Sequence, residues 1–229
     1  MKKTKFKKQK ISVVMSVYND EKNIQNSINS ILNQSFSNFE FLIIDDCSTD
    51  NTLKILNNVD DPRVKIYKNN INLGLTKSLN KLIKYAQYDF IARQDSDDVS
   101  FPSRFEDQLF YIFKKNIIGC TTLATVNGKM WKTPFISRWL PIKFIIKYKN
   151  PFIHGSLMIK KSALLDVGGY SEEFTYAQDY KLFLDLIKNG FDLKILKKSL
   201  YFLNTKNNIS SLKKEEQKKY FEKARDIYF

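Results

Sequence analysis

Three carboxylates, Asp95, Asp97 and Asp98, stand within four residues of one another, directly after the apolar segment Phe90–Ala92. Anions this close repel one another, so local stability gives no reason for the cluster. Mg²⁺ or Mn²⁺ would relieve the repulsion, because these hard cations take oxygen ligands and keep coordination positions open for substrate phosphates. The alternative is a solvated acidic turn, since Asp and Ser are ordinary turn and N-cap residues.

The elements that must position this cluster alternate between buried strands and amphipathic helices. Strands are expected at Ile11–Val17, Phe39–Ile44, Arg63–Tyr67 and the segment ending at Ala92. The first helix has one apolar stripe, formed by Ile24, Ile28, Ile31 and Leu32. Helical crossovers between strands imply a parallel sheet with right-handed connections, so the predicted fold class is α/β.

Polar residues follow three of these strands. They are Ser16–Asn19, Asp45–Asp46 and Asp95–Asp98, and Asn19 or Asp20 is also placed to cap the next helix. In parallel sheets of this kind, ligands bind outside the carboxyl ends of the strands. We therefore expect the three segments to converge on one cleft.

Beyond the acidic cluster the pattern continues with shorter elements. In chain order we expect a helix at 102–115, a strand at 117–126, a hairpin turn at 127–128, a strand at 154–159, a helix at 162–167, a helix from Gln178 to Gly190, and strands at 192–196 and 200–203. The basic, aromatic segment Pro134–Asn150 is expected to pack in the core or an interface, with a membrane-contacting amphipathic helix as the alternative. From Asn204 the chain is polar and then charged, as in a surface helix or a partly disordered tail.

Composition limits the class of protein. The 229 residues are 43% hydrophobic and 14% aromatic, which excludes a disordered chain. With two cysteines and one histidine, neither a disulfide framework nor a His-rich metal site is expected. No apolar run approaches the ~20 residues that span a bilayer, and Ile11–Val17 is expected to be a strand, not a signal peptide.

The formal charge is +14, and six lysines of the first ten residues contribute to it. A tail of this kind is either simply solvated or attracted to an acidic surface, whether anionic lipid or nucleic acid. No helix-turn-helix, zinc-finger or RNP-type pattern occurs, so nucleic acid is not an expected partner.

Five segments carry a family resemblance: VVMSVYNDEKNIQNSINSILNQSF, FLIIDDCSTDNT, NLGLTKSLN, IARQDSDD with FPSRFE, and HGSLMIKKSALLDVGGY with AQDY. Together and in this order they resemble the family 2 glycosyltransferases, which have the GT-A fold, over roughly Ile11 to Leu203. Each segment alone is a weak signal, whereas five in order are a strong one. The members most resembled build bacterial surface polysaccharide and lipopolysaccharide.

The resemblance implies a GT-A, Rossmann-like, mostly parallel central sheet flanked by helices, with a smaller acceptor-side subregion. It implies one domain at 11–203, with a nucleotide-binding half at 11–100 and an acceptor and catalytic half at 101–203, between a basic tail at 1–10 and a charged helix or tail at 204–229. The implied activity is inverting transfer from a nucleotide-sugar, a UDP-sugar above all, to a saccharide or lipid-linked saccharide. The implied location is cytoplasmic, with peripheral contact at the inner face of an anionic membrane as an option; the oligomeric state stays open.

The resemblance also assigns roles to residues. Donor-binding positions are Ser16, Val17, Tyr18, Asn19, Asp46, Asp95, Ser96 and Asp97. Among them, Asp46 would accept a hydrogen bond from uracil and Asp95 would meet the ribose or sugar. Asp98, with Asp97, would approach a Mn²⁺ or Mg²⁺ ion on the diphosphate. Asp179 matches the carboxylate that deprotonates the acceptor hydroxyl.

Several of these positions have an alternative role. Tyr18 would instead pack against the first helix, and Asp45 is expected to orient its loop without touching ligand. Arg93 would pair with the diphosphate or, by preference, with a neighbouring Asp. Lys77 would reach a phosphate or lie on a solvated helix face, and His154 would contact diphosphate or metal or serve as a hydrogen-bonded structural residue.

The chain departs from the family pattern near the expected base. The carboxylate pair often found there is Gln178-Asp179, and many relatives carry Arg at the position of Asp185. The acceptor-side region is also short. The competing classes are a sugar-nucleotide-binding module without turnover and a basic nucleic-acid-binding protein; a nucleotidyltransferase is disfavoured, because no Gly-rich loop with Lys or Arg follows the first strand.

Overall fold

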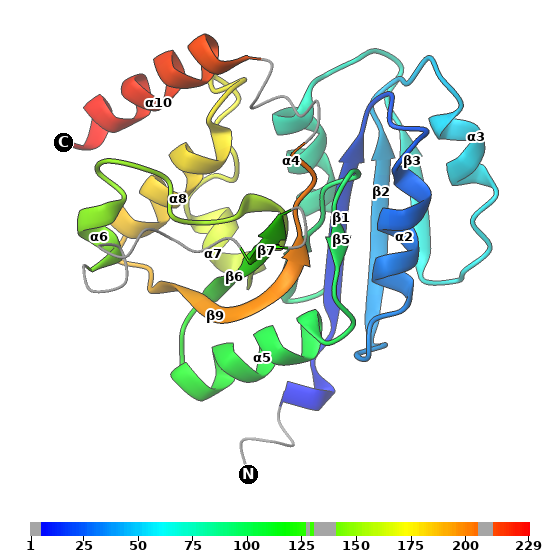
Figure 1. Cartoon of the computed structure of the whole chain (residues 1–229), viewed down its shortest axis with the longest axis horizontal. Coiled ribbons are helices and arrows are strands. Elements are labelled where there is room, and N and C mark those ends of the chain that lie inside the picture. The colour runs from blue at the N-terminus through cyan, green and yellow to red at the C-terminus, as the bar shows by residue number, and fades with distance from the viewer. Residues whose placement is uncertain (1–5, 127–128, 131–140, 206–212) are drawn as a thin grey trace.

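The first half of the chain forms the parallel part of a nine-stranded sheet (Figure 1). The computed structural model describes residues 6–126, 129–130, 141–205 and 213–229. The first four strands are β1 (Ile11–Val17), β2 (Phe39–Asp45), β3 (Val64–Lys68) and β4 (Phe90–Arg93). They lie side by side in the order β3-β2-β1-β4, and every pair among them is parallel, as predicted.

Helices cover both faces of this parallel sheet. They are α2 (Ile24–Leu32), α3 (Thr52–Asn57) and α4 (Leu75–Tyr85). Val13 and Met15 of β1 share a buried cluster with α2 and α3, whereas Val14 shares the opposite cluster with α4. Burial on both faces explains why β1 is a nearly continuous apolar run.

The second half extends the sheet with mixed pairings, since β6 and β9 are parallel and the other new pairs are antiparallel, and it completes the helical layers. Its strands are β5 (Val99–Ser100), β6 (Gly119–Val126), β7 (Lys129–Met130), β8 (Met158–Lys160) and β9 (Leu193–Phe202). Its helices are α5 (Arg104–Lys115), α6 (Ile142–Ile145), α7 (Lys161–Asp166), α8 (Gln178–Lys188) and α10 (Lys214–Tyr228), with 3₁₀ turns η1 (Phe6–Lys8) and η3 (His154–Ser156). β8 is antiparallel to both β4 and β6, so it joins the two halves into one sheet.

The structure corrects three expected elements. The strand predicted at 154–159 begins with η3, and only Met158–Lys160 is strand; an added Cβ at Gly155 would clash with the Asp95 carboxylate, so the chain turns closely against it. The strands expected at 192–196 and 200–203 are the single strand β9. α2 begins after Asn23, not after Asn19 or Asp20, and no side chain caps it.

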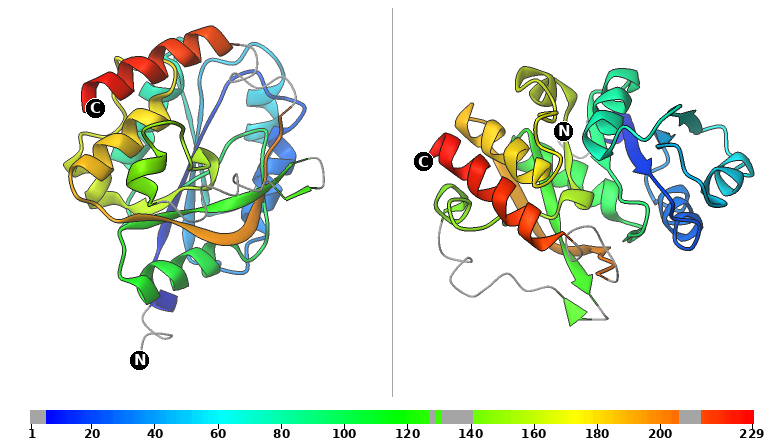
Figure 2. Two further views of the ribbon diagram at one scale, coloured as in Figure 1. Left: turned by 60° about the vertical axis from the view of Figure 1, so that its left-hand side comes forward. Right: turned by 90° about the horizontal axis from the view of Figure 1, so that it is seen from above.

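Both ends of the described chain are attached to the fold. Phe6 of η1 is buried and its ring meets Phe110 of α5 edge-on, with 5.8 Å between centroids. At the other end α10 runs alongside α8 (Figures 1 and 2), where Phe221 stacks on Tyr180 at 3.9 Å. The expected charged C-terminal segment is thus a helix from Lys214.

Some expectations cannot be compared with the structure, because they lie outside the described residues. These are Lys2, Lys3 and Lys5 of the basic tail, the turn at 127–128 and residues 134–140 of the aromatic segment. Across the described part of the chain, no helix combines the length and apolar character needed to cross a membrane.

Candidate active site

The carboxyl ends of β1, β2 and β4 open onto one cleft, as predicted. The predicted residues that line it are Ser16, Tyr18, Asn19, Asp46, Asp95, Ser96, Asp97, Asp98, His154 and Asp179. Its volume is about 1710 Å³. Pockets for one small ligand usually measure about 300–1,000 Å³, so this cleft has room for a donor and part of an acceptor together.

The end of β1 supplies one wall of the cleft. Tyr18 is 50% exposed and lines the cleft. Asn19 has a φ of 51°, and its side-chain oxygen accepts a hydrogen bond from Thr49 N at 2.7 Å. Val17 is buried and outside the lining; its carbonyl accepts the amide of Asp46 at 2.8 Å, which fixes β1 against β2.

Asp46 organises the loop between β3 and α4. Its carboxylate accepts hydrogen bonds from Asn69 Nδ2 at 2.7 Å, Leu73 N at 2.9 Å and Gly74 N at 2.8 Å. The side chain is 2% exposed yet borders the cleft. In the loop after β2, the Asp45 carboxylate accepts a hydrogen bond from the Ser48 amide at 3.2 Å, in agreement with its expected role in orienting that loop.

Gln94, which sequence analysis did not single out, holds the acidic turn in shape. This buried amide donates to the Asp98 carbonyl at 2.9 Å and to Ser27 Oγ at 3.0 Å, and it accepts from Ser100 Oγ at 2.6 Å. The Asp95 amide donates to the Tyr201 hydroxyl at 3.1 Å. Internal bonds therefore fix the backbone of the turn while the Asp95 and Asp97 side chains line the cleft.

Two buried guanidinium groups lie beneath the turn. Arg93 Nη1 pairs with Asp95 Oδ1 at 2.5 Å, so the expected pairing with a neighbouring Asp is confirmed. Burial is the largest single effect and lowers the pKa of the Arg93 guanidinium, but Asp95, Tyr170 and Tyr201 together outweigh it and raise that pKa. Arg104 donates to the carbonyls of Gly155 and Arg93, each at 3.0 Å, which ties α5 and η3 to the end of β4.

Asp97 and Asp98 have the chemistry of a divalent-cation site. Burial, then the nearby charge of Asp95, raises the pKa of Asp97 to about 7 and that of Asp98 to about 8. Among the described residues, no group of three or more His, Cys, Asp or Glu side chains could hold a metal ion unaided. The pair still fits Mg²⁺ or Mn²⁺, because such ions are commonly held by one or two carboxylates together with substrate phosphates.

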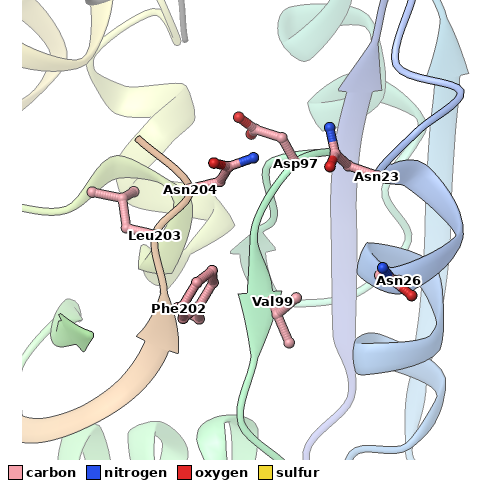
Figure 3. Close-up of a pocket in the computed structure, with 7 residues that line it drawn as sticks. All are labelled: Asn23, Asn26, Asp97, Val99, Phe202, Leu203 and Asn204. Carbon is pink, nitrogen blue, oxygen red and sulfur yellow. The ribbon is translucent and has the colours of Figure 1, made fainter. Parts of the chain in front are cut away.

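A smaller hollow of about 260 Å³ adjoins the acidic turn (Figure 3). Asp97 lies at its edge between Asn23, which precedes α2, and Asn204, which follows β9. The Asn204 amide donates to Asp98 Oδ1 at 2.7 Å. The end of β9 therefore closes the acidic turn from the acceptor half of the chain.

Asp179 stands at the start of α8 and lines the same cleft. Asn150 Nδ2 donates to Asp179 Oδ2 at 2.7 Å, which fixes one carboxylate oxygen. Burial raises the pKa of Asp179, although the amides of the first helical turn act in the opposite direction. The helix N-terminus favours the ionised carboxylate, but desolvation is the larger effect.

His154 and Lys77 differ in their relation to the cleft. His154 Nε2 is 2.7 Å from the Tyr170 hydroxyl, and burial, then the charge of Arg93, lowers the pKa of the imidazole well below its usual range. This geometry agrees with the expected role of His154 as a neutral, hydrogen-bonded structural residue, although its ring also borders the cleft. Lys77 is exposed on α4 and does not line the cleft among the described residues, as on a solvated helix face.

Comparison with known proteins agrees with this geometry. Residues 12–173 match the family described as "Glycosyl transferase family 2". The chain belongs to glycosyltransferase family 2. The putative glycosyltransferase EpsE of Bacillus subtilis is 35% identical over 200 residues, covering 84% of this chain and 72% of EpsE.

Two Escherichia coli relatives and one solved structure are also similar to the transferase. WbnJ, an O-antigen biosynthesis glycosyltransferase, is 38% identical over 77% of this chain and 71% of its own length. WfgD, a UDP-Glc:alpha-D-GlcNAc-diphosphoundecaprenol beta-1,3-glucosyltransferase, is 31% identical over 79% of this chain and 70% of its own length. S. aureus TarS 1–349 in complex with UDP-GlcNAc has a TM-score of 0.74 at 24% identity, covering 87% of this chain and 59% of that one, and it supports the GT-A fold.

The transferase has a cleft wall that sequence analysis missed. Lys213, Gln217, Lys218 and Phe221, at the start of α10, line the cleft with Lys149 and Asn150. Gln217 Oε1 accepts the amide of Ala177 at 3.1 Å, two residues before Asp179. The only sequence signal was a charged C-terminal segment, which does not reveal a contact across 40 residues.

Asp185 fastens α10 to α8. Lys181 Nζ lies 2.7 and 2.8 Å from the two Asp185 oxygens and 2.9 Å from the Tyr228 hydroxyl, which also contacts Asp185. This cluster occupies the helix surface away from the cleft lining. Asp185 therefore positions a wall of the site and makes no phosphate clamp.

Proposed function

We propose that the protein transfers a sugar from a UDP-sugar to a saccharide or lipid-linked saccharide acceptor, with inversion at the anomeric carbon, in surface-glycan synthesis. One observation carries the proposal: a single cleft is lined by the acidic turn Asp95–Asp98 and by the carboxylate of Asp179. Family membership supports sugar transfer. The UDP-sugar and lipid-linked acceptor in the name of WfgD support the two substrate classes.

The nucleotide half would hold the donor. Asp46 borders the cleft and would accept a hydrogen bond from the uracil ring, while Ser16 and Tyr18 would flank the base and ribose. Asp97 and Asp98 would hold Mn²⁺ or Mg²⁺, which supplies positive charge to the departing diphosphate. Asp95, already paired with Arg93, would meet the ribose or the transferred sugar.

Asp179 would act as the general base in a single displacement. Its carboxylate would take the proton of the acceptor hydroxyl as the hydroxyl oxygen bonds to the anomeric carbon. The bond from this carbon to the diphosphate breaks, and the nucleoside diphosphate leaves with the electron pair. Attack on the face opposite the leaving group inverts the anomeric centre. A pKa raised by burial suits the role, because a stronger base accepts a proton more readily.

The acceptor would enter beside α10. The lining there combines Lys149, Lys213 and Lys218 with the aromatic rings of Tyr176 and Phe221. Aromatic faces suit saccharide rings, and cations suit the phosphates of a lipid-linked acceptor. A lipid-linked acceptor would also place the protein at a membrane surface, peripherally and on the side that holds nucleotide-sugars.

A panel of nucleotide-sugars tests the donor assignment. The purified chain is heated with UDP-sugars and GDP-sugars in the presence of Mn²⁺, and release of nucleoside diphosphate is measured in parallel. A ligand at 100 times its Kd stabilises the native state by about 2.7 kcal/mol. We expect stabilisation and slow donor hydrolysis with a UDP-sugar only. Equal stabilisation by UDP and GDP would contradict the role of Asp46, and binding without any turnover would favour a binding module.

A further inference from the structure

Three large aromatic side chains lie exposed on the surface beside the cleft. Phe144 is 46% exposed, Tyr148 70% and Phe229 58%. The rings of Phe144 and Tyr148 are 5.4 Å apart, and Lys147 Nζ lies 4.7 Å above the ring of Phe229. Contiguous exposed apolar surface is uncommon unless it meets a partner. These residues form one surface, the aromatic patch (Phe144, Tyr148 and Phe229).

Buried residues between the exposed rings fix the orientation of the aromatic patch. Ile145 and Ile146, between the two exposed rings of α6 and its following turn, are buried at 7% and 0% exposure. The Tyr180 hydroxyl donates to the Ile146 carbonyl at 2.6 Å, which ties this turn to α8. Because the buried positions are fixed in the core, the rings of Phe144 and Tyr148 stay on the outer face.

Positively charged lysines surround the aromatic patch. Lys143 and Lys147 are exposed and Lys149 is half-buried. None of the three forms an ion pair within the part of the chain that the structure describes. Lysines without an ion pair among exposed rings suit an anionic surface better than a neutral one, because their charges are left to attract an external anion.

We propose that the aromatic patch is the docking face for an anionic lipid bilayer, with its rings at headgroup depth and its lysines on the lipid phosphates. Aromatic side chains favour the membrane–water interface, and lysines extend their charged ends toward lipid headgroups. Each lysine near an anionic leaflet strengthens binding, and two kinds of signal together give stable attachment. The inference rests on the proposed function, which places the acceptor at a membrane.

The position of the aromatic patch suits delivery of a lipid-linked acceptor. Lys149, the residue after Tyr148, lines the cleft. The basic tail does not have this position, because η1 precedes the amino end of β1 (Figure 1). The cleft lies at the carboxyl end of the same strand. A seven-residue strand is about 23 Å long, so a membrane bound by the tail would face the opposite end of the sheet.

Vesicle binding of matched variants tests the proposal. The double variant Phe144→Ser with Tyr148→Ser is compared with wild type by co-sedimentation with vesicles of phosphatidylcholine containing phosphatidylglycerol. We expect about ten-fold weaker partitioning, since each ring would lose part of the ~1.5–3 kcal/mol that full burial of such a side chain provides. Lys143→Gln with Lys147→Gln should lower partitioning by about five-fold per lysine, and only on the anionic vesicles.

Tyr85→Ser is the matched control, because Tyr85 on α4 is exposed to the same extent as Phe144, 46%.

Further measurements separate this proposal from the alternatives. Donor hydrolysis by the double variant should equal that of wild type, so a loss of vesicle binding cannot be mistaken for a failed transferase. Replacing the six N-terminal lysines by Gln should leave most vesicle binding intact. The proposal is overturned if that replacement abolishes binding while the double variant binds normally. It is also overturned if sedimentation shows that the aromatic patch instead joins two copies of the chain.

Discussion

At the scale of single residues, the acidic turn has the clearest electrostatic character. Asp98 is 2% exposed and Asp97 lies next to it, and the pKa values of both are raised by burial and by neighbouring charge. A folded chain keeps such a cluster at the expense of stability unless a cation occupies it. The cluster is therefore better explained by ligand binding than by folding.

Replacing Asp98 by Ala should separate these two roles. The replacement removes a buried carboxyl whose ionisation the fold opposes, but it also removes the acceptor of the Asn204 amide, so the melting temperature should change little. The stabilisation by Mn²⁺ with UDP, about 2.7 kcal/mol at 100 times the Kd, should disappear, and sugar transfer should fall close to background. Asp166→Asn, at an exposed position outside the cleft lining, is the control that should keep its response to Mn²⁺. Full activity of Asp98→Ala in excess chelator would exclude the metal role.

At the scale of elements, the loop between β3 and α4 connects folding to donor binding. Asp46 holds this loop through three hydrogen bonds, one of them from Asn69. Its carboxylate therefore has a structural role beside the expected contact with uracil. The two roles are separable, because Asn69 touches Asp46 without lining the cleft among the described residues.

Asp46→Asn and Asn69→Ala should have different effects on UDP affinity. The first removes a charge-assisted hydrogen bond to the base, which costs about 1.5–3 kcal/mol, or roughly one to two decades in Kd. The second should lower the melting temperature and leave the Kd for UDP close to that of wild type. Isothermal titration with UDP measures both. If Asn69→Ala weakens UDP as much as Asp46→Asn does, Asp46 acts only through the loop.

The sequence predicted the elements of the parallel half because each carries its own local signal. Strands buried on both faces are apolar runs, and polar residues at their ends mark the cleft. β9 was divided in two because Lys197 and Lys198 are exposed and interrupt the apolar pattern, although the backbone continues along β6. The 3₁₀ turn at His154 depends on a close approach to Asp95 that no local pattern encodes.

The residues of the candidate site also divide into those that the sequence predicted and those that it did not. Asp46, Asp95–Asp98 and Asp179 were predictable, because motif and strand order place them together. The role of Gln94 was not predictable, because this buried side chain holds the acidic turn through hydrogen bonds with Ser27 and Ser100, which no local pattern indicates. The wall made by α10 was also unpredictable, because its packing on α8 joins residues far apart in the sequence.

At the scale of the whole molecule, the cleft lies between two halves that supply different chemistry. Asp46 and the acidic turn follow β2 and β4, whereas Asp179 comes from α8 and Lys213 and Lys218 come from the start of α10. β8 joins the halves through its antiparallel pairing with β4 and β6. The sheet therefore connects β4, which leads into the acidic turn, to the second half of the chain, where α8 carries Asp179.

The central claim is that Asp179 is the base of this displacement, and its replacement by Asn tests it most directly. Turnover with a UDP-sugar and a lipid-linked acceptor analogue is measured together with the anomeric configuration of the product. Asp179→Asn should lower turnover by about 10²–10⁴-fold with UDP affinity nearly unchanged, while the exposed control Asp166→Asn should behave like wild type. The wild-type product should be inverted. Near-normal turnover of Asp179→Asn, or a product that retains configuration, would contradict the mechanism.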